Sequence, residues 1–272
     1  MRQLLNTLFV TSEDIYLSLD GENVVANRGG EQVARYPLHT LQSILSFSYS
    51  GASPALMGAC AERDVSLAFC TPRGRFLARV TGQTQGNVLL RRKQYRVADD
   101  PLQSCRLARM MIFGKVFNAR WSVERTRRDH ALRIDGERFA AVSAGLRDIL
   151  PVLAQAETTD RLRGLEGSAA VAYFSILDEM IPQSKDTFFF TERSRRPPLD
   201  AFNALLSFAY SLLAHDCASA LEAVGLDAYV GFLHRDRPGR ESLALDLMEE
   251  LRPCFADRFV LTLVNNRVLK AS

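Results

Sequence analysis

The sequence has no apolar run long enough to cross a membrane. Runs such as Val152-Leu153-Ala154 and Leu261-Thr262-Leu263-Val264 are far shorter than the roughly 20 residues that a spanning helix needs. The first residues soon reach Glu13 and Asp14 and contain no small-residue cleavage site. We therefore expect neither a signal peptide nor a membrane-bound protein.

The sequence also has no pair of cysteines at the CxxC spacing of zinc and redox motifs. Its five cysteines are odd in number and far apart, which favours reduced, mostly buried thiols over a zinc site or a disulfide framework. We therefore expect a cytoplasmic protein. The five are Cys60, Cys70, Cys105, Cys217 and Cys254.

What the sequence does contain is ample apolar material for a folded core. Of its 272 residues, 47% are hydrophobic and 24% are charged, which excludes global disorder. At roughly 100–200 residues per domain, the length allows one large domain or two modest ones.

The net charge of +3 is unevenly divided along the chain. Residues 1–85 carry seven basic and seven acidic side chains, and residues 86–128 carry eleven basic and three acidic ones. Residues 129–272 carry sixteen basic and twenty-one acidic side chains. The basic excess is thus concentrated in about forty residues, whereas the acidic surplus lies downstream.

The basic segment has a helical pattern, with apolar residues at spacings of three and four. Such a cationic face can be a solvated surface, a membrane-surface element or a phosphate-binding element. The separate acidic surplus favours nucleic acid, because a site that acts on phosphates needs carboxylates and cations in different places. The candidate DNA-binding residues here are Arg91, Arg92, Arg106 and Arg109.

The first 80 residues are typical of β-strands. Residues 14–26 alternate around an Asp20-Gly21 turn, and Pro72-Arg73-Gly74 marks a second turn between residues 66–70 and 75–80. Residues 54–63 favour one short helix. The pattern predicts a small β-rich domain over residues 1–80.

Beyond a polar, Gly-bearing linker at residues 81–87, the periodicity becomes helical. We therefore predict an α+β protein of two domains, the second one all-α over residues 88–272. Its expected helices span residues 88–97, 101–121, 137–156, 160–180 and 198–224.

Three stretches of the helical part contain candidate functional residues. Glu166 lies among Gly, Ser and Ala, where a carboxylate is costly to bury unless it is paired or binds a cation. The alternative is a first-turn Glu stabilised by the helix dipole. His234 follows an apolar run, and Asp246 and Glu249 share one face of a helix after it.

Glu166, His234, Glu249 and Asp246 supply carboxylate oxygens and one imidazole, but no thiolate. Carboxylates favour Mg²⁺ or Mn²⁺, and the imidazole shifts the preference towards Mn²⁺. Such an ion can stabilise the attacking and leaving oxygens of a displacement at phosphorus. Arg163, Arg235, Arg237 and Arg240 lie beside these ligands in sequence and are candidates to contact DNA phosphates.

These motifs together resemble the CRISPR-associated integrase, the nuclease of spacer acquisition, and are most similar to its subtype I-C branch. The resemblance covers nearly the whole chain. The motifs that carry it are Gly164-Leu165-Glu166-Gly167, Tyr173-Phe174, Gly231-Phe232-Leu233-His234, Arg237-Pro238-Gly239-Arg240 and Ser242-Leu243-Ala244-Leu245-Asp246-Leu247-Met248-Glu249-Glu250.

The resemblance implies a β-domain that mediates dimerisation and an all-α catalytic domain. It implies a divalent metal held by Glu166, His234 and Glu249, with Asp246 as the rival or supporting carboxylate. The implied activity is metal-dependent cleavage of DNA and insertion of short foreign DNA into the repeat array, by attack of a 3′-hydroxyl on a phosphodiester.

The implied partners are double-stranded DNA, a second copy of the chain, and a small ferredoxin-like CRISPR-associated dimer. The family usually continues some tens of residues beyond the stretch that corresponds to Asn265–Lys270, whereas this sequence stops at Ser272, so the chain is expected to be short at its C-terminus. This leaves an alternative function open, that of a non-catalytic DNA-binding scaffold with the same fold.

Overall fold

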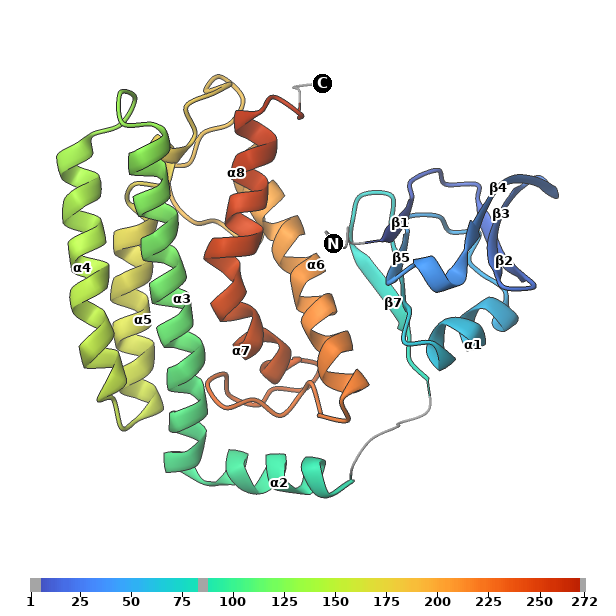
Figure 1. The fold of residues 1–272 in the computed structure, drawn as a ribbon, viewed down its shortest axis with the longest axis horizontal. Coiled ribbons are helices and arrows are strands. Elements are labelled where there is room, and N and C mark those ends of the chain that lie inside the picture. The colour runs from blue at the N-terminus through green and yellow to red at the C-terminus, as the bar shows by residue number, and fades with distance from the viewer. Residues whose placement is uncertain (1–5, 83–87, 270–272) are drawn as a thin grey trace. The chain divides into compact units, whose positions relative to one another are not determined.

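The computed structural model describes residues 6–82 and 88–269, which belong to two compact units, Met1–Gly86 and Asn87–Ser272 (Figure 1). The predicted α+β class is confirmed, with strands in the first unit and helices in the second. Most of the expected linker, residues 83–87, lies outside the described residues.

Within its described residues, 6–82, the first unit contains two sheets and one α-helix. A four-stranded sheet has the order β1-β5-β6-β7, in which β1, β5 and β6 are parallel and β7 is antiparallel to β6. A three-stranded antiparallel sheet has the order β2-β3-β4. The strands are β1 Thr7–Val10, β2 Tyr16–Asp20, β3 Asn23–Arg28, β4 Glu31–Pro37, β5 Ser43–Ser46, β6 Ser66–Cys70 and β7 Phe76–Val80.

Local sequence signals in this unit are confirmed. The β2–β3 hairpin closes at Gly21, which has a φ of +56°, and the β6–β7 turn contains Gly74 at +80°. Both backbones need the left-handed region that glycine enters without strain. Helix α1 spans Pro54–Glu62, because Ser53 accepts a hydrogen bond from the Leu56 amide and Pro54 favours the first helical position.

The second unit is a helical assembly around one long helix, α3. Helix α3 packs against α4 and α5 and also contacts α7 and the π-helical turn η3 (Figure 1). Buried residues of α3, such as Ile112, Val116 and Ala119, belong to the main core. The elements are α2 Val88–Asp99, α3 Pro101–Asp129, α4 Gly136–Ala154, α5 Thr159–Phe174, η2 Asp178–Met180, α6 Ala201–Ala223, α7 Ser242–Leu251, η3 Arg252–Asp257 and α8 Arg258–Asn265.

The expected helices differ from these mainly at their ends. Helix α3 continues to Asp129 instead of residue 121, and α5 ends at Phe174 instead of residue 180. Helix α6 is long and apolar enough to cross a membrane by length and composition alone, a feature that a search for continuous apolar runs misses. Its buried side chains pack in the helical core, as in the core helix of a globular unit.

The five cysteines are free, and four of them are buried, as predicted. Burial raises the pKa of Cys217 to about 12 and that of Cys60 to about 11, so these thiols stay protonated and unreactive at neutral pH.

Candidate functional site

Glu166, His234 and Glu249 converge on one region of the helical unit from α5, the 231–234 loop and α7. Lys115 of α3 links two of them, because its ammonium donates to Glu166 and lies 2.6 Å from Glu249 Oε2. His234 Nε2 lies 4.0 Å from Glu249 Oε1. These three predicted residues, which span positions 166 to 249 of the chain, are therefore brought into one region.

Asp246 holds the histidine loop on helix α7. Its carboxylate accepts the backbone N–H groups of Phe232, Leu233 and His234 at 2.6, 2.8 and 3.0 Å. It also lies 2.5 Å from Nδ1 of the His234 ring. Since Asp246 is completely buried and both of its oxygens are engaged, it orients His234 and leaves Nε2 facing Glu249.

Gly231 allows this close approach of the loop to α7. A Cβ at position 231 would lie 2.8 Å from Ser242 Cβ and 2.9 Å from Asp246 Oδ2. No side chain can occupy that space unless the loop or the helix moves, so glycine is required by packing here and not by its φ angle.

Glu249 is a buried carboxylate surrounded by cations. Arg252, one helical turn later, lies 2.8 Å from Oε1, and Lys115 lies beside Oε2. Burial raises the pKa of Glu249, but the charges of Arg252 and Lys115 outweigh it and hold that pKa below its ordinary value. Glu249 is therefore ionised at neutral pH and available to a cation.

Arg163 ties helix α5 to the histidine loop. Its guanidinium donates to the Leu233 carbonyl and also pairs with Asp160 at 2.5 Å. Glu166 lies one turn further along the same helix, so Arg163 fixes the position of the carboxylate relative to His234. The predicted DNA contact of Arg163 stays a prediction, because in this structure the side chain serves an internal contact.

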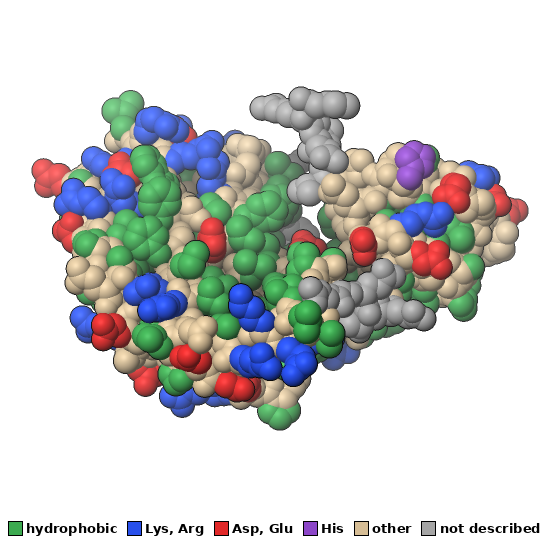
Figure 2. All heavy atoms as spheres, turned by 60° about the horizontal axis from the view of Figure 1, so that its bottom comes forward, with side chains coloured by type: hydrophobic (Ala, Val, Ile, Leu, Met, Phe, Trp, Pro, Cys, Tyr) green, Lys and Arg blue, Asp and Glu red, His purple; other side chains and the backbone are tan. Residues whose placement is uncertain are grey.

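The remaining predicted DNA-binding arginines fall into two groups. Arg91 and Arg109 donate to the carbonyls of Gly225 and Ala156, at 3.2 and 3.3 Å. The others have exposed or half-exposed side chains, and Figure 2 shows Lys and Arg spread among hydrophobic side chains on the face that α2 helps to form. These others are Arg92, Arg106, Arg235, Arg237 and Arg240.

The donor set suits a hard divalent cation. It comprises two carboxylates and one imidazole whose other ring nitrogen is bound to a carboxylate, the usual arrangement of a metal-ligating histidine. Yet no three His, Cys, Asp or Glu side chains within residues 6–82 and 88–269 are close enough to hold an ion as they stand. The Lys115 ammonium lies between Glu166 and Glu249, so a cation already bridges the two carboxylates.

Sequence reasoning missed Lys115 and Arg252 as members of this site. The sequence did hint at Lys115, because this basic residue lies on the same helix beside the apolar positions Ile112, Val116 and Ala119. Arg252 follows Glu249 by three residues, a spacing that places both on one helix face.

The sequence and the fold both resemble those of known proteins. A CRISPR-associated endonuclease Cas1 from Chlorobaculum tepidum is 47% identical over 271 residues, which cover 100% of this chain and 79% of that protein. A casposase bound to integration product superimposes with a TM-score of 0.79 at 22% identity, covering 98% of this chain and 74% of that one. A Cas6-RT-Cas1–Cas2 complex gives 0.74 at 22% identity, covering 97% and 28%.

The predicted family is therefore confirmed, whereas the predicted subtype and the short C-terminus stay predictions. Residues 8–272 match the family described as CRISPR associated protein Cas1, over both the β-rich and the helical unit. The chain belongs to the Cas1 family of CRISPR-associated proteins.

Proposed function

We propose that this chain is a divalent-metal-dependent DNA endonuclease and integrase of CRISPR adaptation. The observation that carries the proposal is the convergence of Glu166, His234 and Glu249 on one region, with Asp246 fixing the histidine ring. The 47% identity to a relative named as a CRISPR-associated endonuclease supports the same activity.

In this proposal Glu166, His234 and Glu249 would hold Mg²⁺ or Mn²⁺. Asp246 is a positioning residue, because four hydrogen bonds already occupy its carboxylate. When bound, the metal supplies charge stabilisation for a displacement at phosphorus. Lys115 now bridges Glu166 and Glu249, so a metal held by these carboxylates would replace its ammonium, which would then be free to contact a substrate phosphate.

The joining reaction conserves the number of phosphodiester bonds. The 3′-hydroxyl oxygen of a short DNA fragment forms a bond to a target phosphorus, and the bond from that phosphorus to the 3′ oxygen of the target strand breaks. The attacking hydroxyl loses its proton and the departing oxygen gains one. Arg252 keeps Glu249 ionised throughout, since it pairs with that carboxylate at 2.8 Å.

The proposed partners are double-stranded DNA, a second copy of the chain that binds through the β-rich unit, and a small ferredoxin-like CRISPR-associated dimer. The fold likeness to Cas1 in a Cas6-RT-Cas1–Cas2 complex supports assembly with such a partner. We also place the protein in the cytoplasm, where its DNA substrates are found.

Strand transfer into a supercoiled plasmid tests this function. A short duplex with free 3′-hydroxyl ends is incubated with plasmid and Mn²⁺, and nicked and joined products are separated on a gel. We expect product from the parent protein and a decrease of about a hundredfold or more for His234→Ala and Glu249→Gln, as for the loss of a metal ligand or its support.

The control is Arg147→Gln on α4, an exposed arginine paired with Asp148 at 2.9 Å, which should leave the rate unchanged. DNA binding and circular dichroism are measured for every variant. A parent protein that binds DNA equally with Mn²⁺ or chelator, and never nicks or joins it, would show the scaffold alternative to be correct.

A further inference from the structure

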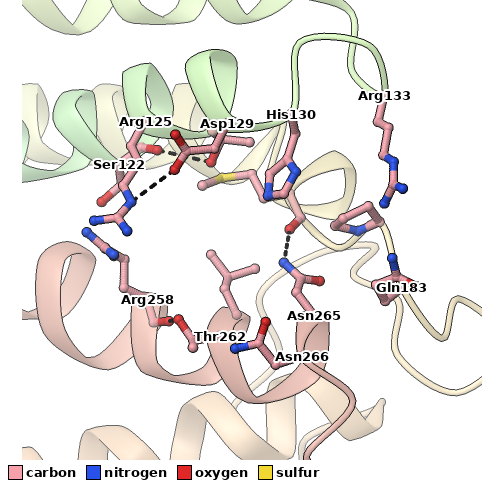
Figure 3. A pocket seen from close by; sticks show the side chains of 14 residues that line it. Ser122, Arg125, Asp129, His130, Arg133, Gln183, Arg258, Thr262, Asn265 and Asn266 are labelled. Atoms are coloured by element: carbon pink, nitrogen blue, oxygen red, sulfur yellow. Dashed lines mark hydrogen bonds and ion pairs between the residues drawn. The ribbon is translucent and has the colours of Figure 1, made fainter.

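A polar pocket distinct from the candidate metal site lies between the end of α3 and helix α8. Its volume is about 280 Å³, and α3, the turn after it, the segment after η2, and α8 all contribute to its wall (Figure 3). It contains none of the proposed metal ligands. Arg125 of its wall follows Lys115 by ten residues on α3, which is about 15 Å along the helix axis.

The wall of the pocket carries an excess of positive charge. Arg125 and Arg258 lie side by side at one end of it, and Arg133 lies at the other end (Figure 3). Asp129 is the single carboxylate among the described lining residues, and it is shared between Arg125 at 3.2 Å and Arg128 at 2.9 Å. The cations of the wall thus outnumber its anion.

Two of these arginines lack a close ion pair in the described residues. Within the part of the chain that the structure describes, Arg133 and Arg258 form no salt bridge. Arg258 is half-buried; burial lowers its pKa and the nearby charge of Arg125 lowers it further, whereas the charge of Asp129 raises it. Because Arg125 acts on Arg258 more strongly than Asp129 does, a further anion between the two guanidinium groups would relieve their repulsion.

The rest of the wall offers polar groups for a ligand larger than a bare ion. Asn265 donates its amide to the Met180 carbonyl at 2.9 Å, but its Oδ1 is buried without a hydrogen-bond partner. Asn266 and His130 line the space between the two cationic ends (Figure 3). The cations suit the phosphate groups of a ligand, and the unpartnered Asn265 oxygen suits an N–H or O–H donor of the same ligand.

We propose that this pocket is a phosphate-binding site, in which Arg125 and Arg258 hold one phosphate group and Arg133 provides a second contact. Guanidinium groups bind phosphate oxygens through paired hydrogen bonds, which suits this end of the pocket. Cations at both ends favour a DNA strand, with successive phosphates, over a single small anion. That preference rests on the proposed function, whereas the phosphate chemistry does not.

The first arm of the test uses inorganic phosphate as the probe. The melting temperature of the full chain is measured with increasing sodium phosphate, against sodium chloride at equal ionic strength. We expect phosphate to raise the melting temperature of the parent protein, and Arg258→Gln to abolish that rise. Asp129→Asn should enlarge the rise, because it removes the competing carboxylate and releases Arg125.

The second arm measures binding of a fluorescent 20-base-pair duplex by anisotropy in chelator, where no strand transfer takes place. We expect Arg258→Gln to weaken binding and to lower the slope of log affinity against log salt by about 1, the loss of one phosphate contact. Arg147→Gln removes an equal charge from a remote surface and serves as the control in both arms.

The two arms separate the sources of the phosphate. A loss in the DNA arm that the control does not share supports a DNA strand as the occupant. A loss in the phosphate arm alone supports a small phosphate compound. Identical behaviour of Arg258→Gln and Arg147→Gln in both arms would overturn the proposal. Because neither arm requires catalysis, failure of the proposed nuclease function would be seen separately.

Discussion

Asp246 and Glu249 are three residues apart on one helix, yet their surroundings give them different tasks. Asp246 is enclosed by backbone N–H groups and the His234 ring, whereas Glu249 faces Lys115, Arg252 and the free side of His234. The sequence showed that both acids share one helix face. It did not show which one meets the loop, because that depends on how residues 231–234 fold over α7.

Asp257 is a buried carboxylate whose ionisation is linked to stability. It is 1% exposed and accepts a hydrogen bond from the Tyr210 hydroxyl at 2.5 Å. Burial raises its pKa from 3.8 to about 6, although the bond from Tyr210 opposes this. Between these two pH values the folded protein binds more protons at Asp257 than the unfolded chain does, so this group makes stability decrease as pH rises.

We therefore predict that Asp257→Asn gains stability relative to the parent as pH rises from 4 to 7. The shift of about two pKa units corresponds to about 3 kcal/mol across that interval. Urea unfolding of both proteins at pH 4, 5, 6 and 7 measures the difference in free energy of unfolding. A difference that stays constant with pH would contradict the assignment of the raised pKa to Asp257.

At the scale of the elements, sequence patterns predicted those structural features that depend on residues close together in the chain. The hairpin at Gly21, the short helix capped by Ser53 and the helical faces of residues 101–121 follow from turn chemistry, capping and periodicity. The parallel pairing of β1, β5 and β6 was not predicted, because these strands are joined through long connections and their register depends on packing.

The candidate site, too, was predicted only in those features that depend on local sequence. Acidic and imidazole residues could be recognised by type, but the placement of Lys115 between Glu166 and Glu249 depends on α3 crossing both α5 and α7. Likewise, the pocket at Arg258 requires α8 to lie beside the end of α3. Both features arise from contacts between residues far apart in the chain, which one sequence alone does not specify.

The contact between the histidine loop and α7 gives a prediction at this scale. In Gly231→Ala the added Cβ would overlap Ser242 and Asp246, so we expect a loss of about 1–3 kcal/mol in the free energy of unfolding. Strand transfer should also decrease, because the loop that carries His234 must move.

Gly145→Ala on α4 is the matched control, since nothing lies within 4 Å of its Cβ position. In a helix this change should stabilise the protein by about 0.5–1 kcal/mol. Urea unfolding measures both variants. Equal effects of the two substitutions would mean that the close approach at Gly231 contributes nothing.

At the scale of the whole molecule, charge is divided between the two units. The β-rich unit is nearly balanced, whereas the basic surplus of residues 86–128 falls on α2 and α3 of the helical unit. The proposed metal ligands lie downstream, where acidic residues prevail. Under the proposed function, exposed cations of these helices hold the DNA backbone, and Lys115 of α3 reaches the carboxylate centre that acts on it.

This division predicts how DNA binding responds to salt. Arg92 and Arg106 are exposed on α2 and α3, and replacing both with Ala should weaken binding of every duplex sequence alike. The slope of log affinity against log salt should decrease by about 2 if each arginine contacts one phosphate.

Arg28→Ala in the β-rich unit removes a cation that pairs with Asp14 at 2.8 Å and should leave the slope unchanged. Anisotropy with a labelled duplex between 50 and 300 mM salt measures the slopes, and an equal decrease for Arg28→Ala would mean that the basic helices have no special part in binding DNA.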